Sequence, residues 1–131
     1  MTLNELIQIA GILIGFQLTI FTFRITRELT LKRKKRWFPM PDFINLLSVF
    51  ITVLFLFLYP LKNIETYDIK LCQKFFGFSV LLFVIYPFAL IGHYEMFSKA
   101  SQRSSDQKYI TKQETFVLII GGIISILYFF L

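Results

Sequence analysis

Residues 43–61 read FINLLSVFITVLFLFLYPL, a mostly apolar run without a charged side chain. The hydrocarbon core of a bilayer is about 30 Å thick, and a helix of about 20 apolar residues crosses it. The run therefore predicts a transmembrane helix. Three further apolar stretches occupy residues 3–23, 75–97 and 115–131. We expect an all-α integral membrane protein, with one domain of four transmembrane helices joined by short loops.

The overall composition favours the same fold class. Of the 131 residues, 56% are hydrophobic, and phenylalanine occurs 17 times. A soluble domain of this length does not need that much apolar surface. A signal peptide would carry its positive charge before the apolar run, whereas here Arg24 and Arg27 follow it. We therefore expect the first helix to be retained as a reverse-oriented anchor.

The basic residues are unevenly divided among the predicted loops. The first and third loops, with their flanks, carry seven and four lysines or arginines, against three in the second. Positively charged residues concentrate in cytoplasmic loops. The distribution predicts a multi-pass protein of the plasma (inner) membrane with both termini outside.

A basic block precedes the second helix. It predicts contact with anionic lipid headgroups or with a cytosolic protein, whereas nucleic acid is a less common partner of such a block in a membrane protein. Asp42 follows two prolines and is expected to cap the next helix. The block and its interfacial aromatic anchor comprise Lys32, Arg33, Lys34, Lys35, Arg36 and Trp37.

Small and polar residues form one stripe along the first helix. Such a stripe predicts close helix packing, because glycines let another backbone approach and threonine hydroxyls can bond across the contact. The pattern does not say whether the neighbour belongs to the same chain or to a second copy. The last helix carries a similar pair. The predicted packing residues are Gly11, Gly15, Thr19, Thr22, Gly121 and Ser125.

Polar residues inside the apolar stretches form a candidate pore or polar track. Gln17 lies opposite the glycine stripe, and an amide there needs an interhelical hydrogen bond or a pore. Arg24 could pair with Glu28 one helical turn away. His93 and Glu95 suggest either a proton relay or an ordinary interfacial position. The track comprises Gln17, Asn45, Ser48, Thr52, Ser79, Tyr86 and His93.

Enzyme motifs are missing from the sequence. Cys72 is the only cysteine and His93 the only histidine, so neither a cysteine cluster nor a triad is evident, and we expect no metal or cofactor. The sequence predicts a non-enzymatic homo-oligomer in the lipid bilayer, acting as a pore or ion channel or as a membrane-perturbing effector. Two alternatives remain: a scaffold or sensor that recruits a cytosolic protein through its basic loops, and a small proton-coupled transporter.

Overall fold

The computed structural model describes residues 2–30, 38–97 and 109–130, and these residues form helices and connecting turns without a strand. Four of its helical spans are long and apolar enough to cross a membrane. The four predicted apolar helices are therefore present. The basic block at 32–37 lies outside the described residues. The elements are α1 (Leu3–Thr30), α2 (Met40–Thr52), η1 (Val53–Leu58), α3 (Tyr59–Lys62), α4 (Ile69–His93) and α5 (Lys112–Phe130).

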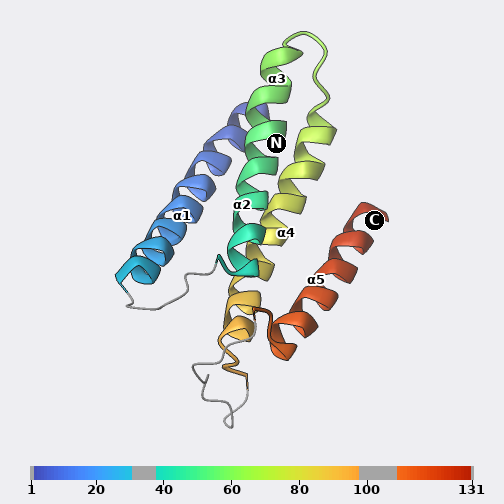
Figure 1. Cartoon of the computed structure of the whole chain (residues 1–131). Helices are drawn as coiled ribbons and strands as arrows, with labels where there is room; N and C mark the ends of the chain where they lie inside the picture. Colours follow the sequence, from blue (N-terminus) through green and yellow to red (C-terminus); the bar gives the residue numbers. More distant parts are fainter. Residues whose placement is uncertain (1, 31–37, 98–108, 131) are drawn as a thin grey trace.

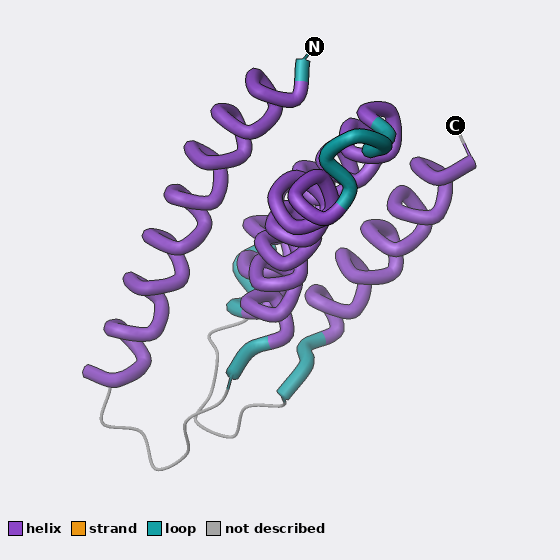
Figure 2. The backbone as a smooth tube through the Cα atoms, turned by 90° about the horizontal axis from the view of Figure 1, so that it is seen from above, coloured by secondary structure: helices purple, strands orange, loops and turns teal. Residues whose placement is uncertain are grey.

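Two helical spans lie at the centre of the bundle, and the other two pack against them. The continuous span α2–η1–α3 runs antiparallel to α4, and α1 and α5 flank this pair on opposite sides (Figures 1 and 2). In the described part of the chain, α1 contacts α2, η1 and α4, whereas α5 contacts α4 alone. The termini share one end of the bundle (Figure 2). We call this the terminal end, and the opposite end, with Arg24 and His93, the Arg24 end.

Each of the four helical spans extends beyond at least one end of the apolar run that predicted it. The first continues to Thr30, and the second covers Met40–Lys62. Helix α4 begins at Ile69 rather than at residue 75 and ends at His93 rather than at residue 97, and α5 begins at Lys112 rather than at residue 115. Asp68 caps α4 by accepting a hydrogen bond from the Lys70 main-chain N–H at 2.8 Å. Hydropathy locates the apolar centre of a helix but not its polar end turns. Capping hydrogen bonds determine where the helix begins and ends.

The second span contains a π-helical segment that the sequence analysis does not anticipate. Proline lacks an N–H, and its ring clashes with the carbonyl four residues earlier in a regular helix. The segment η1 ends two residues before Pro60, and the Tyr59 N–H bonds to the Leu54 carbonyl, five residues back. The wider turn lets the chain pass Pro60 and continue as a helix to Lys62.

Apolar residues cover the outside of the bundle as well as part of its interior. Phe16, Phe50 and Phe88 are each more than half exposed, as expected where lipid replaces water as the solvent. Towards the terminal end, the interior is filled by a buried apolar cluster: Leu6, Ala10, Leu56, Cys72 and Phe76. Cys72 is fully buried there, which gives no support to a disulfide between two copies.

Glycines bring α5 close to α4. A Cβ atom at Gly121 would lie 2.9 Å from Ile85 Cγ2, and one at Gly92 would lie 2.9 Å from the main-chain nitrogen of Glu114. The predicted packing residue Gly121 thus contacts a helix of the same chain, and Ser125 is half-buried. Gly122 faces open space.

We predict that Gly92→Ala weakens the α4–α5 contact, since the main chain of α5 cannot move aside as a flexible side chain can. Overpacking of this kind costs about 1–3 kcal/mol in the free energy of unfolding. The matched control is Gly122→Ala, which meets nothing within 4 Å and should be neutral or stabilising by up to about 1 kcal/mol. Denaturant titration in micelles, followed by circular dichroism, measures both. Equal stabilities of the two variants would contradict this packing.

A buried polar interior as the candidate functional site

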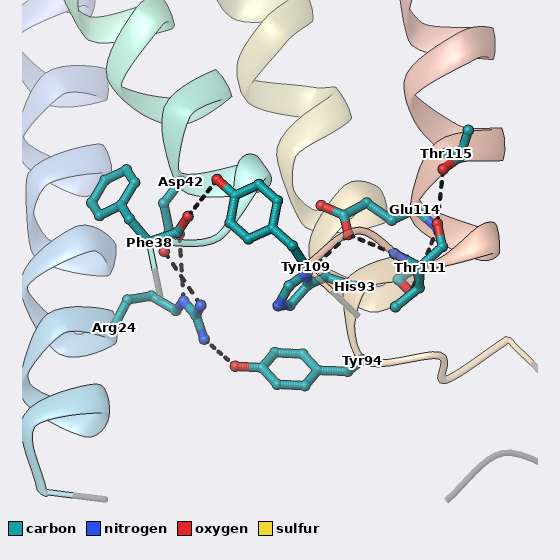
Figure 3. Close-up of polar contacts among 10 residues, drawn as sticks. Arg24, Phe38, Asp42, His93, Tyr94, Tyr109, Thr111, Glu114 and Thr115 are labelled. Carbon is teal, nitrogen blue, oxygen red and sulfur yellow. Dashed lines mark hydrogen bonds and ion pairs between the residues drawn. The ribbon is translucent and has the colours of Figure 1, made fainter. Parts of the chain in front are cut away.

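Arg24 joins three segments of the chain at one end of the bundle. Its Nη2 lies 3.3 Å from Asp42 Oδ2, and its Nε donates to Asp42 Oδ1 at 3.4 Å. Its Nη1 donates to the Tyr94 hydroxyl, just after α4 (Figure 3). Arg24 is 7% exposed and Asp42 3%. A forked guanidinium facing both oxygens of a carboxylate is a strongly oriented pair.

This pair corrects one expectation and adds a partner that the sequence analysis does not name. Arg24 pairs with Asp42 on α2, whereas the expected pairing with Glu28 falls on a side chain outside those that the structure describes. Asp42 does not cap α2, because the N-cap is Pro39 and no side-chain cap bond is present there. Sequence spacing shows neighbours on one helix only, and a pair that joins two helices has no such signal.

Two tyrosines complete the surroundings of the ion pair. The Tyr86 hydroxyl donates to Asp42 Oδ1 at 3.3 Å, so that carboxylate accepts from both α1 and α4. The Tyr94 ring has the guanidinium carbons of Arg24 and Arg27 at 5.5 and 5.6 Å from its centroid. Both distances suit cation–π contacts. The Arg24 charge is therefore neutralised and enclosed inside the bundle.

A second set of hydrogen bonds lies nearer the middle of the same helices. Gln17 Nε2 donates to Ser48 Oγ at 2.7 Å, and Asn45 Nδ2 donates to the Gln17 main-chain oxygen at 3.2 Å. Ser48 Oγ donates to the main-chain oxygen of Ser79 at 2.6 Å. Thr52 Oγ1 lies 2.8 Å from Ser79 Oγ. We call Gln17, Asn45, Ser48, Thr52 and Ser79 the polar ladder.

The predicted polar track is thus assembled inside one chain. All of its members, from Gln17 to His93, are buried. Gln17 makes the interhelical bond that its position requires. A pore formed between copies of the chain would not be lined by these side chains as they are placed here.

The last member, His93, pairs with an acid on α5. Its Nδ1 lies 2.9 Å from Glu114 Oε2, and Glu114 is 0% exposed (Figure 3). The buried acid beside His93 is therefore Glu114, which the sequence analysis missed, while Glu95 lies in the turn after α4. His93 is the last residue of α4 and is 7% exposed, and its place at a membrane interface stays a prediction.

A sequence signal for Glu114 was present. Residues 111–114 read TKQE, the spacing of a capping box, in which the side chain of each end residue bonds the main chain of the other. The Glu114 N–H bonds to Thr111 Oγ1 at 3.0 Å, and the Thr111 N–H bonds to Glu114 Oε2 at 3.3 Å. Thr111 Oγ1 also donates to the Gly92 carbonyl at 2.6 Å. The start of α5 is thereby fixed to the end of α4.

The predicted packing stripe of α1 lies on the outside. Gly11, Gly15, Thr19 and Thr22 are exposed, and a Cβ atom at either glycine would meet nothing within 4 Å. The Thr19 and Thr22 hydroxyls donate back to main-chain carbonyls of their own helix, at 2.7 and 2.8 Å. We call the residues Gly11, Gly15, Thr19 and Thr22 the outer stripe.

Within the described residues, no group of three metal-ligating side chains occurs. Buried ionisable side chains in these described segments form the pairs Arg24–Asp42 and His93–Glu114, each joining different helices. These two pairs can fix the relative positions of the helices that they join. Each pair can also exchange its hydrogen bonds for bonds to other polar groups.

Replacing Arg24 by methionine should destabilise the protein strongly, because Asp42 would remain buried without its cation. Breaking a buried pair from one side costs about 3–5 kcal/mol. Arg27→Met is the matched control, since Arg27 is exposed, and it should have little effect. The double variant Arg24→Met/Asp42→Leu should recover much of the loss. Unfolding free energies of the four proteins measure this, and an Arg24→Met protein as stable as Arg27→Met would refute the assignment.

No protein-family model, no curated protein and no solved structure matches this chain. Its own contacts and exposed faces are therefore the guide to its function.

Proposed function

We propose that this chain is a non-enzymatic, multi-pass membrane protein that works as a homo-oligomer, and that the assembled copies form a pore for small cations. The observation that carries the proposal is the outer stripe on α1. It is uncharged, it covers residues 11–22 of α1, and all four of its residues are exposed, with nothing within 4 Å of a Cβ atom at either glycine.

The two faces of α1 support contact between copies. The face that packs inside the chain carries Leu6, Ala10, Gln17 and Arg24. At about 100° per residue, the outer stripe lies about half a turn away from that face. Lipid chains gain nothing from glycines and hydroxyls, whereas another helix gains a close backbone approach. A second copy of the chain fits this face better than lipid does.

The hydroxyls of the outer stripe favour cations over anions. Thr19 and Thr22 have committed their protons to main-chain carbonyls, so each hydroxyl oxygen retains acceptor lone pairs towards the outside. In a ring of copies whose α1 helices meet at Gly11 and Gly15 and diverge towards the Arg24 end, the Thr19 and Thr22 oxygens would line the path. Rings of oxygen acceptors are the usual means by which channels replace the hydration shell of a cation.

The proposed location follows from charge. With the basic loops in the cytoplasm, the Arg24 end faces inwards and both termini lie outside the plasma (inner) membrane. The basic block at Lys32 to Arg36 would then lie at the anionic headgroups. The exposed phenylalanines of the bundle suit the surrounding lipid.

We predict that Gly15→Leu reduces both oligomer formation and cation flux through purified protein in liposomes, because leucine blocks the close approach of a second backbone. The monomer should keep its stability, since a Cβ atom at Gly15 would meet nothing within 4 Å. Gly122→Leu is the matched control, because Gly122 is equally open but lies on α5. Undiminished oligomers and flux in Gly15→Leu would exclude α1 as the contact.

The variant Thr19→Val separates a pore from a mere contact. It keeps the shape of the side chain but removes the acceptor oxygen, so flux should fall while the oligomer persists. A wild-type protein that oligomerises but is electrically silent would instead favour the scaffold that recruits a cytosolic partner through its basic loops.

The buried pair of His93 and Glu114 favours a second candidate, a small proton-coupled transporter. Intramembrane ionisable pairs often serve as proton relays, and this pair joins α4 to α5 at 2.9 Å. Under this alternative, the proton flux of liposomes under a pH gradient should be lost in His93→Ala. Proton flux that survives the substitution removes the transporter from consideration.

A further inference from the structure

The interior between α1, α2 and α4 is divided into a polar and an apolar part. Near the Arg24 end lie the Arg24–Asp42 pair and the polar ladder, and all of these residues are buried. Towards the terminal end, the cluster of Leu6, Ala10, Leu56, Cys72 and Phe76 fills the space without a charged group. The polar part of the interior therefore ends where the apolar cluster begins.

Two oxygen atoms of the polar ladder have no hydrogen-bond donor. They are Gln17 Oε1 and Asn45 Oδ1, in residues that are 0% and 1% exposed. Their amide nitrogens are both used, on Ser48 Oγ and on the Gln17 main-chain oxygen. Exchanging the oxygen and nitrogen of Asn45 would set two oxygens against each other. Exchanging those of Gln17 would require the Ser48 proton, which is already donated to the Ser79 carbonyl. The hydrogen bonds thus fix both oxygens as acceptors.

The two amides are held close together. The Asn45 side chain reaches the main chain of Gln17, and the Gln17 side chain reaches Ser48, which lies one turn beyond Asn45 on α2. Two acceptors in one buried region call for a ligand that donates twice. An anion has no proton to give, and an apolar ligand would leave both oxygens unpaired.

Charge decides between a neutral donor and a cation. The acid nearest in sequence to Asn45 on α2 is Asp42, which Arg24 already neutralises. An added cation would therefore lack a free negative charge and would lie in the same interior as a guanidinium. Water carries two donors and no charge, and buried waters typically bridge such unsatisfied polar groups.

We propose that Gln17 and Asn45 form a binding site for an internal water molecule that bridges their amide oxygens. The site lies inside one chain and does not depend on the oligomer proposed above. The water would join the bonds that Gln17 and Asn45 already make with Ser48 and, through it, with Ser79. Hydration of the interior is therefore one-sided, with Leu56 and Cys72 on the dry side.

Water-edited solid-state NMR of the labelled wild-type protein in bilayers tests this site. The experiment measures the transfer of magnetisation from water protons to the side-chain amides of Gln17 and Asn45. Transfer should be several-fold faster than at the main-chain amides of Leu56 and Cys72, and comparable with transfer at the side chain of Asn63, which lies in the turn between α3 and α4. Transfer to Gln17 and Asn45 as slow as to Leu56 would overturn the proposal.

Two further arms identify the ligand. Exchange of choline for sodium or potassium at constant ionic strength should leave the Gln17 and Asn45 amide shifts unchanged, whereas a saturable shift would identify a cation and overturn the water assignment. In Asn45→Leu, transfer to Gln17 should fall several-fold, because the bridging water loses one acceptor. Unchanged transfer in a folded variant would refute a shared water. The sodium arm uses wild-type protein and remains decisive if Asn45→Leu does not fold.

Discussion

The buried ion pair of Arg24 and Asp42 sets the position of three helices at once. Separated charges in a low-dielectric interior are costly, so the pair has one acceptable geometry and the helices must meet it. Arg24 brings α1 to Asp42 on α2 and to Tyr94 beyond α4. Once the Arg24–Asp42 contact fixes the register of the helices, the 3.6-residue helical repeat determines where the other polar residues of α1 and α2 face. Gln17, two turns from Arg24, then faces α2 at Ser48.

The polar ladder depends on the same register. Asp42, Asn45, Ser48 and Thr52 follow one another at steps of three or four along α2, so they form one buried face. A slip of α1 by one turn would separate Arg24 from Asp42 and Gln17 from Ser48 together. This coupling makes the interior specific: several hydrogen bonds must fail in concert before another packing is possible.

The sequence predicted the helices better than their neighbours, for a physical reason. Hydropathy reports the local preference of each segment, so the four helices follow from residues 3–23, 43–61, 75–97 and 115–131. On α1, however, both the Gly11–Gly15 face and the Gln17 face signal contact, and no local property says which one faces the chain itself. The structure places Gln17 inside and the glycines outside. The pairings of Arg24 with Asp42 and of His93 with Glu114 join residues on different helices, which no periodicity reveals.

The division of the interior constrains any path across a membrane. A path within one chain would have to pass the apolar cluster around Leu56 and Phe76, and it would have to break hydrogen bonds that the polar ladder has already made. A path between copies meets neither obstacle, because the outer stripe is exposed and its threonine protons are committed to their own helix. Because the side chains that the structure describes inside the bundle are packed and hydrogen-bonded, the interior between them offers no open path. The exposed face of α1 is therefore the surface along which an assembly of copies could conduct cations.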